Sequence, residues 1–454
     1  MTLARQLEEQ LRSAIQSGVL PDGTRLPSSR VLAQDVGVSR GVVSRVYAQL
    51  AFEGYILIRQ GSIPTVCTIS RVESVGSDRE ERTRLRYDLR AHLPEVSTFP
   101  RKLWLRSVRD SLGQATGADL SYSDSAGLHE LRLEIAKYLA RARGVTVAPE
   151  RVVVTSGSTH SLSLVARALV RRGSRMMALE NPSHALLREI ARAAGQEVVA
   201  VPVDDEGIVV SRLGGATAVV VSPAHQFPTG VALSPERRKD LLAWAAETRS
   251  LIIEDDYDAQ FRYDHVPVGA LQGLAPNHVV YMGSTDKTFV PALRLGWVVL
   301  PDDLRDDVSR ELFLTVLHVS GMDQLAFADF LRRGEFDRHL RYMRDVYRRR
   351  RDVLVAALSR LLPDVPVHGI AAGLHIVMEM PSDGIAEAVR VRALAGGVAV
   401  ETTAQHTFSG YSGPTGLIIG FGAVAEPGLE VAARVIARIT DEECAAAPPE
   451  ESAA

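Results

Sequence analysis

The sequence predicts two folds in one chain, a small helical domain at the N-terminus and a larger α/β domain after it. Residues 1–66 carry apolar side chains at helical spacing. From about residue 87 the pattern changes to short apolar strands that alternate with helices, which is typical of an α/β sheet. A lysine, Lys287, lies between two of these strands. A chain of 454 residues is also too long for one hydrophobic core, so we expect at least two domains.

Helical periodicity and capping residues divide the N-terminal segment into three helices. Apolar residues recur every three or four positions over residues 3–15. The segment Leu26-Pro-Ser-Ser-Arg30 offers a serine N-cap for a second helix. Gly37 then makes a turn, and a third helix runs from a cap at Ser39 to Gly54. Two short helices joined by a glycine-containing turn are the helix-turn-helix pattern, and residues 55–62 resemble the hairpin of a wing.

The first turns of the third helix carry the candidate DNA contacts. Small polar and basic side chains at this position are typical of a recognition helix, which meets base edges and phosphates. Residues 1–66 hold seven Arg against five Asp or Glu, whereas the whole chain has a net charge of −3. The net charge excludes a broadly basic nucleic-acid binder but not a small DNA-binding module. A helical cap with solvated arginines is the alternative. The candidates are Ser39, Arg40, Ser44 and Arg45.

Residues 67–86 are polar and alternately charged without an apolar period, and we interpret them as a linker. In the domain that follows, polar residues repeatedly come directly after strands. The strand ending at Gly157 leads into a helix that opens with Ser158, where free backbone N–H groups suit an anion. Such residues collect at the carboxyl edge of an α/β sheet, where ligands bind.

The stretch around Lys287 carries the strongest functional signal. Lys287 lies between a small polar run, which includes Ser284, and Arg294, and both flanks are predicted buried strands. Burial would lower the pKa of the lysine, as Schiff-base chemistry requires. Serine and arginine are residue types that hold a phosphate. Together these features favour pyridoxal phosphate (PLP), although a loop lysine is ordinarily only solvated.

The acidic run from Glu254 to Asp258 allows three interpretations. A solvated loop is the default for a run of charges. A hard metal ion would need more converging carboxylates or carbonyls, and we expect no metal site. In the third interpretation, one aspartate faces the pyridinium nitrogen of the cofactor and a tyrosine contacts its phenolic oxygen. The lysine downstream favours this third interpretation.

The N-terminal amino-acid sequence resembles the GntR-type winged helix-turn-helix. The resemblance rests on residues 26–30, on Gly37-Val-Ser-Arg40 and on Glu53-Gly-Tyr55. It implies that Arg30 touches the DNA backbone and that Ser39 and Arg40 face the DNA. The wing departs from the family, because Gly61-Ser-Ile-Pro-Thr-Val66 lacks a second glycine, which puts close approach of the wing tip to the minor groove in doubt.

Residues 87–440 resemble a fold type I PLP enzyme of the class I aminotransferase kind, with a small subdomain from about residue 335. The segments 225–230 and 251–263 are similar to those of the MocR/GabR regulators, which join a GntR-type winged helix to that fold. The resemblance implies that Lys287 binds PLP covalently and that Asp255 and Tyr257 contact its ring. It also implies a homodimer, head-to-tail and domain-swapped, in which Tyr122 reaches the partner's phosphate. The implied phosphate cradle is Gly157, Ser158, Ser284 and Arg294.

Several positions depart from the aminotransferase pattern. His184 stands where an aromatic residue stacks on the ring, Phe227 replaces an asparagine, and Asp286 replaces the serine before the lysine. Asp286 either keeps the Lys287 amine protonated or points to solvent. The positions of two substrate-binding arginines hold Ile418 and Leu186. An α-carboxylate therefore has no arginine clamp there.

Two functions follow from these observations. The first is a PLP-dependent transcriptional regulator that binds double-stranded promoter DNA and senses PLP, or a ligand without a free α-carboxylate. The second is a working aminotransferase with an appended DNA-binding module. The charged N-terminus has no signal-peptide pattern, no apolar run could span a bilayer, and the two cysteines form no framework, so we expect a cytoplasmic protein without membrane contact. Residues 441–454 are expected to be frayed.

Overall fold

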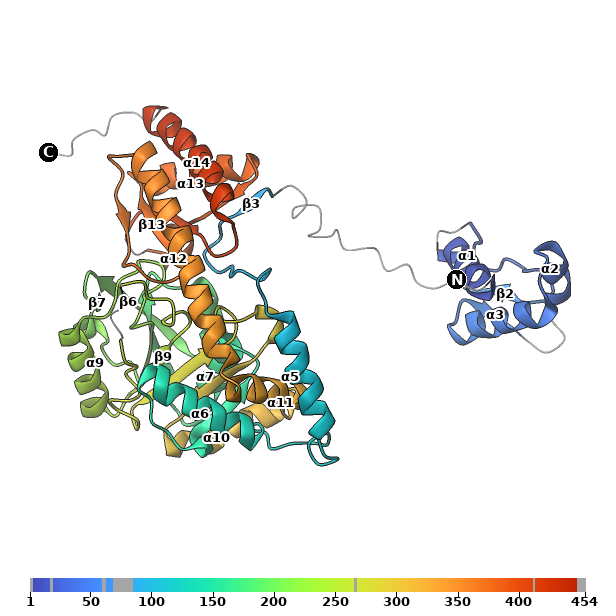
Figure 1. Cartoon of the computed structure of the whole chain (residues 1–454), viewed down its shortest axis with the longest axis horizontal. Helices are drawn as coiled ribbons and strands as arrows, with labels where there is room; N and C mark the ends of the chain where they lie inside the picture. Colours follow the sequence, from blue (N-terminus) through green and yellow to red (C-terminus); the bar gives the residue numbers. More distant parts are fainter. Residues whose placement is uncertain are drawn as a thin grey trace. The chain divides into compact units, whose positions relative to one another are not determined.

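The computed structural model describes residues 3–16, 19–58, 63–67, 85–264, 268–410 and 413–446. The chain forms two compact units, Met1–Thr83 and Arg84–Ala454 (Figure 1). Of the expected linker, residues 68–84 lie outside the described residues, as does the tip of the expected wing at residues 59–62. No helix in the described part of the chain combines the length and hydropathy needed to cross a bilayer.

The N-terminal unit is built on its third helix. It contains α1 (Leu3–Gln16), α2 (Ser29–Asp35), α3 (Arg40–Phe52) and a two-stranded antiparallel sheet of β1 (Ile56–Leu57) and β2 (Thr65–Val66). Four side chains of α3 are buried at helical spacing and form the centre of a small apolar core: Val43, Val46, Tyr47 and Leu50.

Capping residues fix where two of these helices begin. Ser28 is the N-cap of α2, and its hydroxyl accepts a hydrogen bond from the backbone N–H of Val31 at 3.3 Å. Ser39 is the N-cap of α3 but makes no side-chain capping bond. Gly37 has a φ of +68°, in the left-handed region that glycine adopts without strain, so it can turn the chain between α2 and α3.

An eight-stranded sheet forms the centre of the C-terminal unit. Its order is β4-β11-β10-β9-β8-β5-β6-β7. The five strands from β10 to β6 run parallel, whereas β11 is antiparallel to both its neighbours and β7 is antiparallel to β6. The strands are β4 (Val152–Thr155), β5 (Met176–Asn181), β6 (Glu197–Asp204), β7 (Gly207–Ile208), β8 (Ala218–Val221), β9 (Leu251–Asp255), β10 (Val279–Ser284) and β11 (Gly296–Val299).

Helices cover both faces of this sheet, which explains why its central strands are continuous apolar runs. In β10, Val280 and Met282 join a core with α7 and α10, whereas Tyr281, on the opposite face, joins a core with α6 and α11. The helices of this layer are α5 (Arg101–Gln114), α6 (His129–Arg143), α7 (Ser158–Arg171), α8 (Ala185–Ala193), α9 (Pro235–Thr248), α10 (Asp302–Val316) and α11 (Gly321–Arg332).

The long helix α12 (Glu335–Leu361) leads from this layer into the small subdomain (Figure 1). Val346 and Tyr347 of α12 are buried as their spacing suggests, but Tyr342 is 54% exposed. The small subdomain has the sheet β12-β13-β16-β15, formed by β12 (Val367–His368), β13 (His375–Glu379), β16 (Gly416–Gly420) and β15 (Glu401–Thr402). Two helices complete it, α13 (Asp383–Ala395) and α14 (Glu426–Ala446).

Helix α14 corrects the expected boundary of the C-terminal tail. The sequence predicted fraying from residue 441, but the helix continues to Ala446. Arg392 on α13 forms ion pairs with Glu442 and with Glu443, the latter at 2.5 Å. These contacts between two helices stabilise the last turn of α14. Residues 447–454 lie outside the described residues.

A short strand, β3 (Tyr87–Asp88), joins the start of the C-terminal unit to the small subdomain. It pairs in parallel with β14 (Val398–Ala399), with Tyr87 opposite Val398. The backbone N–H of Leu89 extends the ladder by donating to the carbonyl of Ala399. The segment that follows, Arg90 to His92, therefore runs beside the strand that leads to Glu401.

Candidate functional site

A cavity of about 400 Å³ lies at the carboxyl ends of the parallel strands, which is the ligand-binding edge of an open α/β sheet. Strands β5, β8, β9 and β10 each contribute residues to it, and the segment before α5 and the small subdomain close it. The lining residues are Ala91, His92, Ser158, Thr159, Leu179, Glu180, Ser183, His184, Leu186, Leu187, Val220, Ser222, Phe227, Asp255, Tyr257, Ser284, Asp286, Lys287 and Glu401.

One end of the cavity has the chemistry of a phosphate cradle. Helix α7 begins at Ser158, so the N–H groups of its first turn are available for an anion. Gly157 precedes it with a φ of +99°, and a Cβ there would lie 3.1 Å from Nη2 of Arg294. The Arg294 guanidinium donates to the carbonyl of Ser156 at 2.7 Å and to the hydroxyl of Thr159 at 3.4 Å.

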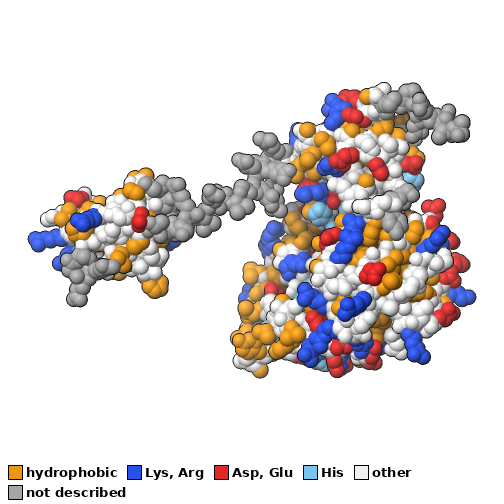
Figure 2. All heavy atoms as spheres, turned by 180° about the vertical axis from the view of Figure 1, so that it is seen from behind, with side chains coloured by type: hydrophobic (Ala, Val, Ile, Leu, Met, Phe, Trp, Pro, Cys, Tyr) orange, Lys and Arg blue, Asp and Glu red, His pale blue; other side chains and the backbone are white. Residues whose placement is uncertain are grey.

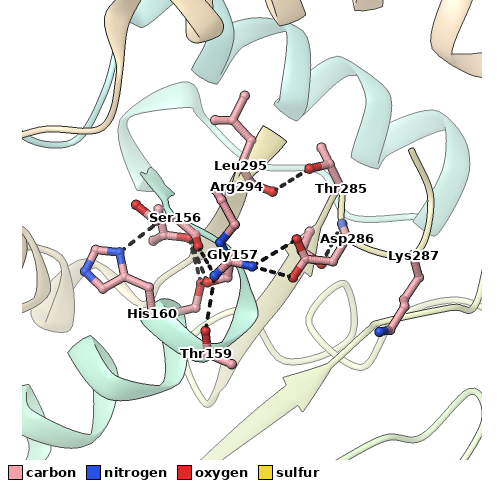
Figure 3. Close-up of polar contacts among 12 residues, drawn as sticks. Ser156, Gly157, Thr159, His160, Thr285, Asp286, Lys287, Arg294 and Leu295 are labelled. Carbon is pink, nitrogen blue, oxygen red and sulfur yellow. Dashed lines mark hydrogen bonds and ion pairs between the residues drawn. The ribbon is translucent and has the colours of Figure 1, made fainter. Parts of the chain in front are cut away.

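Figure 3 shows this group, with Arg294 between the start of α7 and Asp286 and with Lys287 to one side. Asp286 lies 3.3 Å from Nη1 of Arg294. Asp286 therefore does not point to solvent. It pairs with the arginine of the cradle, and its charge also favours the protonated form of the Lys287 amine. The sequence analysis did not identify Thr159, whose position in the first turn of α7 was the available signal.

Lys287 lines the cavity beyond this group. Its Nζ donates to the backbone carbonyl of His92 at 2.5 Å. Burial lowers the pKa of Lys287, and the carboxylates of Asp286, Asp258 and Asp255 oppose that shift. A lysine whose ammonium form is destabilised by burial supplies the neutral amine that carbonyl condensation needs.

Asp255, at the end of β9, is the buried carboxylate of the cavity. It is 9% exposed and accepts no hydrogen bond from the described residues. Burial raises the pKa of Asp255 to about 7, and repulsion from Asp256 and Asp258 adds to the effect. A buried acceptor without a protein donor fits a ligand that brings an N–H group or a positive charge. The pyridinium nitrogen of PLP is such a group.

Tyr257 belongs to a buried polar group next to Asp255. Its hydroxyl donates to the carbonyl of His225 at 2.9 Å, and Nδ1 of His225 lies 2.9 Å from the Asp258 carboxylate. Burial raises the pKa of Tyr257 well above its ordinary value. The tyrosine is therefore neutral and able to donate a hydrogen bond. His225 and Asp258 lay within motifs that the sequence highlighted, but their pairing could not be foreseen because they come from neighbouring strands.

His184 also lines the cavity. Its ring lies 5.5 Å from that of Phe227, and its side chain caps α8 by accepting from the N–H of Leu186 at 3.3 Å. Burial, and then His406, lower the pKa of His184 to about 4. The imidazole is therefore neutral near pH 7.

The two positions without arginine are apolar in the structure. Ile418 is fully buried in β16 and packs with Ala91 and Val377, whereas Leu186 lines the cavity. Arg294 lies in the cradle beside the cavity, and among the described residues no arginine is part of the lining itself. Glu180 and Glu401, which the sequence analysis missed, add two carboxyl groups to the lining.

Tyr122 is not part of the cavity within one chain. Its side chain is 85% exposed, and the ring nearest to it is that of His318, at 6.1 Å between centroids. Tyr122 lies outside the strands and outside the core of its own chain.

A second candidate site is the outer surface of the N-terminal unit. Its polar candidates are exposed at the start of α3 or α2, while Val43 and Val46 of α3 are buried. Among the described residues, no ion pair involves Arg30, Arg40 or Arg45, so these cations are available to a polyanion. The exposed candidates are Arg30, Ser39, Arg40, Ser44 and Arg45.

Each of the two units matches a known protein family. Residues 3–64 match the family described as bacterial regulatory proteins of the gntR family, and residues 97–412 match aminotransferase class I and II. Among solved structures, an archaeal alanine:glyoxylate aminotransferase covers 80% of the chain with a TM-score of 0.72 at 24% identity, and 92% of its own chain is covered. LysN of Thermus thermophilus, complexed with N-(5'-phosphopyridoxyl)-L-leucine, has the same TM-score and covers 82% of this chain and 96% of its own. The second unit therefore has the aminotransferase fold.

Full-length relatives combine the same two parts. The pyridoxine biosynthesis transcriptional regulator PdxR of Corynebacterium glutamicum is 31% identical over 97% of this chain and 96% of its own length. The probable rhizopine catabolism regulatory protein MocR of Rhizobium meliloti is 34% identical over 82% of this chain and 80% of its own.

A DNA-binding helix-turn-helix joined to an aminotransferase-like domain defines a class of transcriptional regulators. This chain belongs to that class, the MocR-type regulators of the GntR family.

Proposed function

We propose that this regulator binds PLP in the cavity of its aminotransferase-like domain and that the bound ligand alters its affinity for promoter DNA. The observation that carries the proposal is the presence of Lys287 and Asp255 in one cavity beside an anion cradle. When bound, PLP supplies an aldehyde that can condense with a primary amine and an electron-withdrawing pyridinium ring.

Each group of the cofactor has a candidate partner. The Lys287 amine would hold the aldehyde carbon, and Asp255 would accept from the pyridine N–H. Tyr257 would donate to the phenolic oxygen in place of the His225 carbonyl. His184 would cover one face of the ring. The proposed phosphate partners are Gly157, Ser158, Ser284 and Arg294.

Regulation rather than steady transamination is supported by the lining of the cavity. Transamination needs the substrate carboxylate held in a fixed position, and arginine is the usual partner. Leu186 and Ile418 provide no donor, and burying a carboxylate against them would be costly. The similar full-length proteins are also named as regulators.

We further propose a homodimer in which the partner's Tyr122 completes the phosphate site. Exposed apolar side chains gather on α5, on the loop before Tyr122 and at the ends of α10 and α11, and Figure 2 shows this surface at the lower left. Monomers rarely expose so contiguous an apolar area. The patch residues are Leu105, Leu112, Leu120, Phe313, Leu314 and Met322.

The proposal is tested by cofactor trapping and DNA binding on the full-length protein. PLP-loaded protein should absorb visible light, borohydride should fix the cofactor on the peptide containing Lys287, and Lys287→Ala should lose both signals. DNA affinity should differ between the apo and loaded proteins. Trapping on another lysine, or equal DNA affinity of the two forms, would reject the assignment.

A further inference from the structure

Glu401 is a charged residue of the cavity wall, and the proposed PLP site assigns it no contact with the cofactor. It belongs to β15, where it is directly opposite Ile418 in the sheet. It thus lies beside the position where a substrate-binding arginine was expected, but it carries the opposite charge. Its side chain is 17% exposed and lines the cavity together with Lys287.

Glu401 is held as a carboxylate by its surroundings. Its Oε2 accepts from the backbone N–H of Ala91 at 2.8 Å, and its Oε1 lies 3.6 Å from Nε2 of His406. Nδ1 of His92 lies 4.0 Å from Oε2. Burial alone would raise the pKa of Glu401, but His406 and the Ala91 N–H outweigh it and hold the value at about 2.

The other carboxyl groups of the cavity have partners or are neutral. Asp286 pairs with Arg294, Asp255 is proposed to face the pyridine nitrogen, and burial raises the pKa of Glu180 to about 8. Among the described lining residues, Lys287 is the one lysine or arginine, and the Glu401 carboxylate favours its ammonium form. If the Lys287 amine condenses with the aldehyde of PLP, water would be released and an imine carbon–nitrogen double bond would replace the amine. The Glu401 carboxylate would then face the cavity without the Lys287 ammonium, beside the imidazoles of His92 and His406.

We propose that Glu401 makes the cavity selective for an amine ligand that carries a second cationic group and excludes amines that carry a carboxylate. The ligand's first amine would take the imine bond from Lys287, whose own amine is released as the new bond forms. The second group, an ammonium or guanidinium, would pair with Glu401 in place of the lysine. A ligand carboxylate at this position would meet a like charge within a partly desolvated site. The inference rests on the proposed function and defines its ligand class.

Three amines of equal length test the charge preference. Cadaverine, pentylamine and δ-aminovalerate share a primary amine and a five-carbon chain and end in an ammonium, a methyl group and a carboxylate. Titrated into the PLP-loaded full-length protein, each should change the absorbance of the bound cofactor. We expect cadaverine to bind about tenfold more tightly than pentylamine, which is the lower end of the coupling measured for close charge pairs at interfaces, and δ-aminovalerate to bind most weakly.

Variants of Glu401 assign the preference to this residue. Glu401→Gln keeps the acceptor for Ala91 but removes the charge, so cadaverine should fall to the affinity of pentylamine while pentylamine is unchanged. Glu401→Asp keeps the charge and should keep the preference. Glu379→Gln is the matched control, because Glu379 is exposed and pairs with His368 at 2.6 Å in the same subdomain. Calorimetry with the apo protein is a further control, because the Lys287 amine is then still present beside Glu401 and no preference for cadaverine is expected.

The outcomes separate the inference from the proposed function. Equal or tighter binding of δ-aminovalerate than of cadaverine, or an unchanged order of affinities in Glu401→Gln, overturns the role of Glu401. If PLP fails to bind Lys287, the proposed function fails, whereas normal PLP binding with equal affinities for cadaverine and pentylamine overturns the role of Glu401 alone. If the order of amine affinities holds but the amines do not change the affinity for DNA, the proposed ligand sensing is rejected and the charge selectivity of the cavity stands.

Discussion

At the residue scale, burial sets the protonation of two carboxyl groups of the cavity, Glu180 and Asp255. Glu180 accepts from the backbone N–H of Ser222 at 3.1 Å, but burial outweighs this bond and raises its pKa to about 8. Asp255 is shifted in the same direction, to about 7. Such groups lie close to the point of titration near neutral pH, where an incoming cation changes their charge state most easily.

Asp255→Asn should weaken PLP binding. A buried pyridinium left without its carboxylate costs about 3–5 kcal/mol, or roughly a hundredfold or more in affinity. The measurement is an absorbance titration of the apo protein with PLP, and Asp205→Asn, on the exposed loop between β6 and β7, is the control. An affinity equal to that of the wild type would show that Asp255 does not face the ring nitrogen.

Glu180→Gln should reduce the pH dependence of stability. The pKa of Glu180 rises from 4.5 in the unfolded chain to about 8 in the fold. Between these values the folded state holds a proton that the unfolded state lacks. The free energy of unfolding therefore falls by about 1.4 kcal/mol for each pH unit as the pH rises through this window.

Denaturant unfolding of the apo protein at several pH values measures that slope. The slope of Glu180→Gln should be less negative than that of the wild type by about the same 1.4 kcal/mol per pH unit. Buried histidines such as His184, whose pKa is lowered to about 4, contribute in both proteins and cancel in the difference. Glu150→Gln changes an exposed side chain and should give the same slope as the wild type. Equal slopes for Glu180→Gln and the wild type would contradict the raised pKa of Glu180.

The sequence predicted functional residues well where a side chain of suitable chemistry lies at or just after the end of a strand. Lys287, Asp255 and Ser158 could be chosen because each follows a strand of the sheet. Glu401 could not be chosen, because its strand has only two residues, Glu401–Thr402, and its place in the cavity depends on pairing with β16. Its hydrogen bond from Ala91 joins residues that are 310 positions apart, and such a contact leaves no local pattern in the sequence.

At the element scale, α3 presents different side chains to the core and to solvent. Val43 and Val46 are buried, while Arg40, Ser44 and Arg45 are exposed. The cap at Ser39 and the glycine at position 37 made this helix predictable, because both signals are local. The end of α14 was not predictable, because Arg392, which stabilises it, belongs to another helix.

Arg40→Ala should weaken binding to the cognate operator by about 1–3 kcal/mol if Arg40 reads a base edge. Binding of labelled cognate and scrambled duplexes at fixed salt measures the effect. Arg5→Ala, on α1, removes a similarly exposed charge and is the control. An equal loss on the two duplexes would make Arg40 a phosphate contact instead.

At the scale of the whole molecule, sheet order is the feature that the sequence could not supply. Strand β11 lies between β4 and β10 although it follows β10 in the chain, and this places Gly157 next to Gly296 and Arg294. The phosphate cradle is thus a consequence of topology. The patch around Leu105 and Leu314 is likewise a property of the assembled surface, because its members come from separate helices.

The quaternary structure can be tested on this patch. We expect the wild type to be a dimer at micromolar concentration in sedimentation experiments, since an isologous contact would bury the patch on both copies. Leu105→Glu combined with Leu314→Glu should give a monomer that binds PLP less tightly, because the partner's Tyr122 is lost. Leu274→Glu changes an equally exposed leucine elsewhere and should remain dimeric. A monomeric wild type would reject the proposed dimer.

The pairing of β3 with β14 has a consequence for how the two units communicate. The N–H groups of Arg86 and Tyr87 donate to the carbonyl of Gly397. The same segment continues to His92, whose carbonyl accepts a hydrogen bond from the Lys287 amine. The segment that opens the C-terminal unit is therefore anchored beside the proposed ligand site. Linkage is reciprocal: whatever factor a ligand applies to DNA affinity, the operator applies to ligand affinity. A promoter occupied by this protein would then act as an effector of its own sensor, and free and DNA-bound molecules would respond to different ligand concentrations.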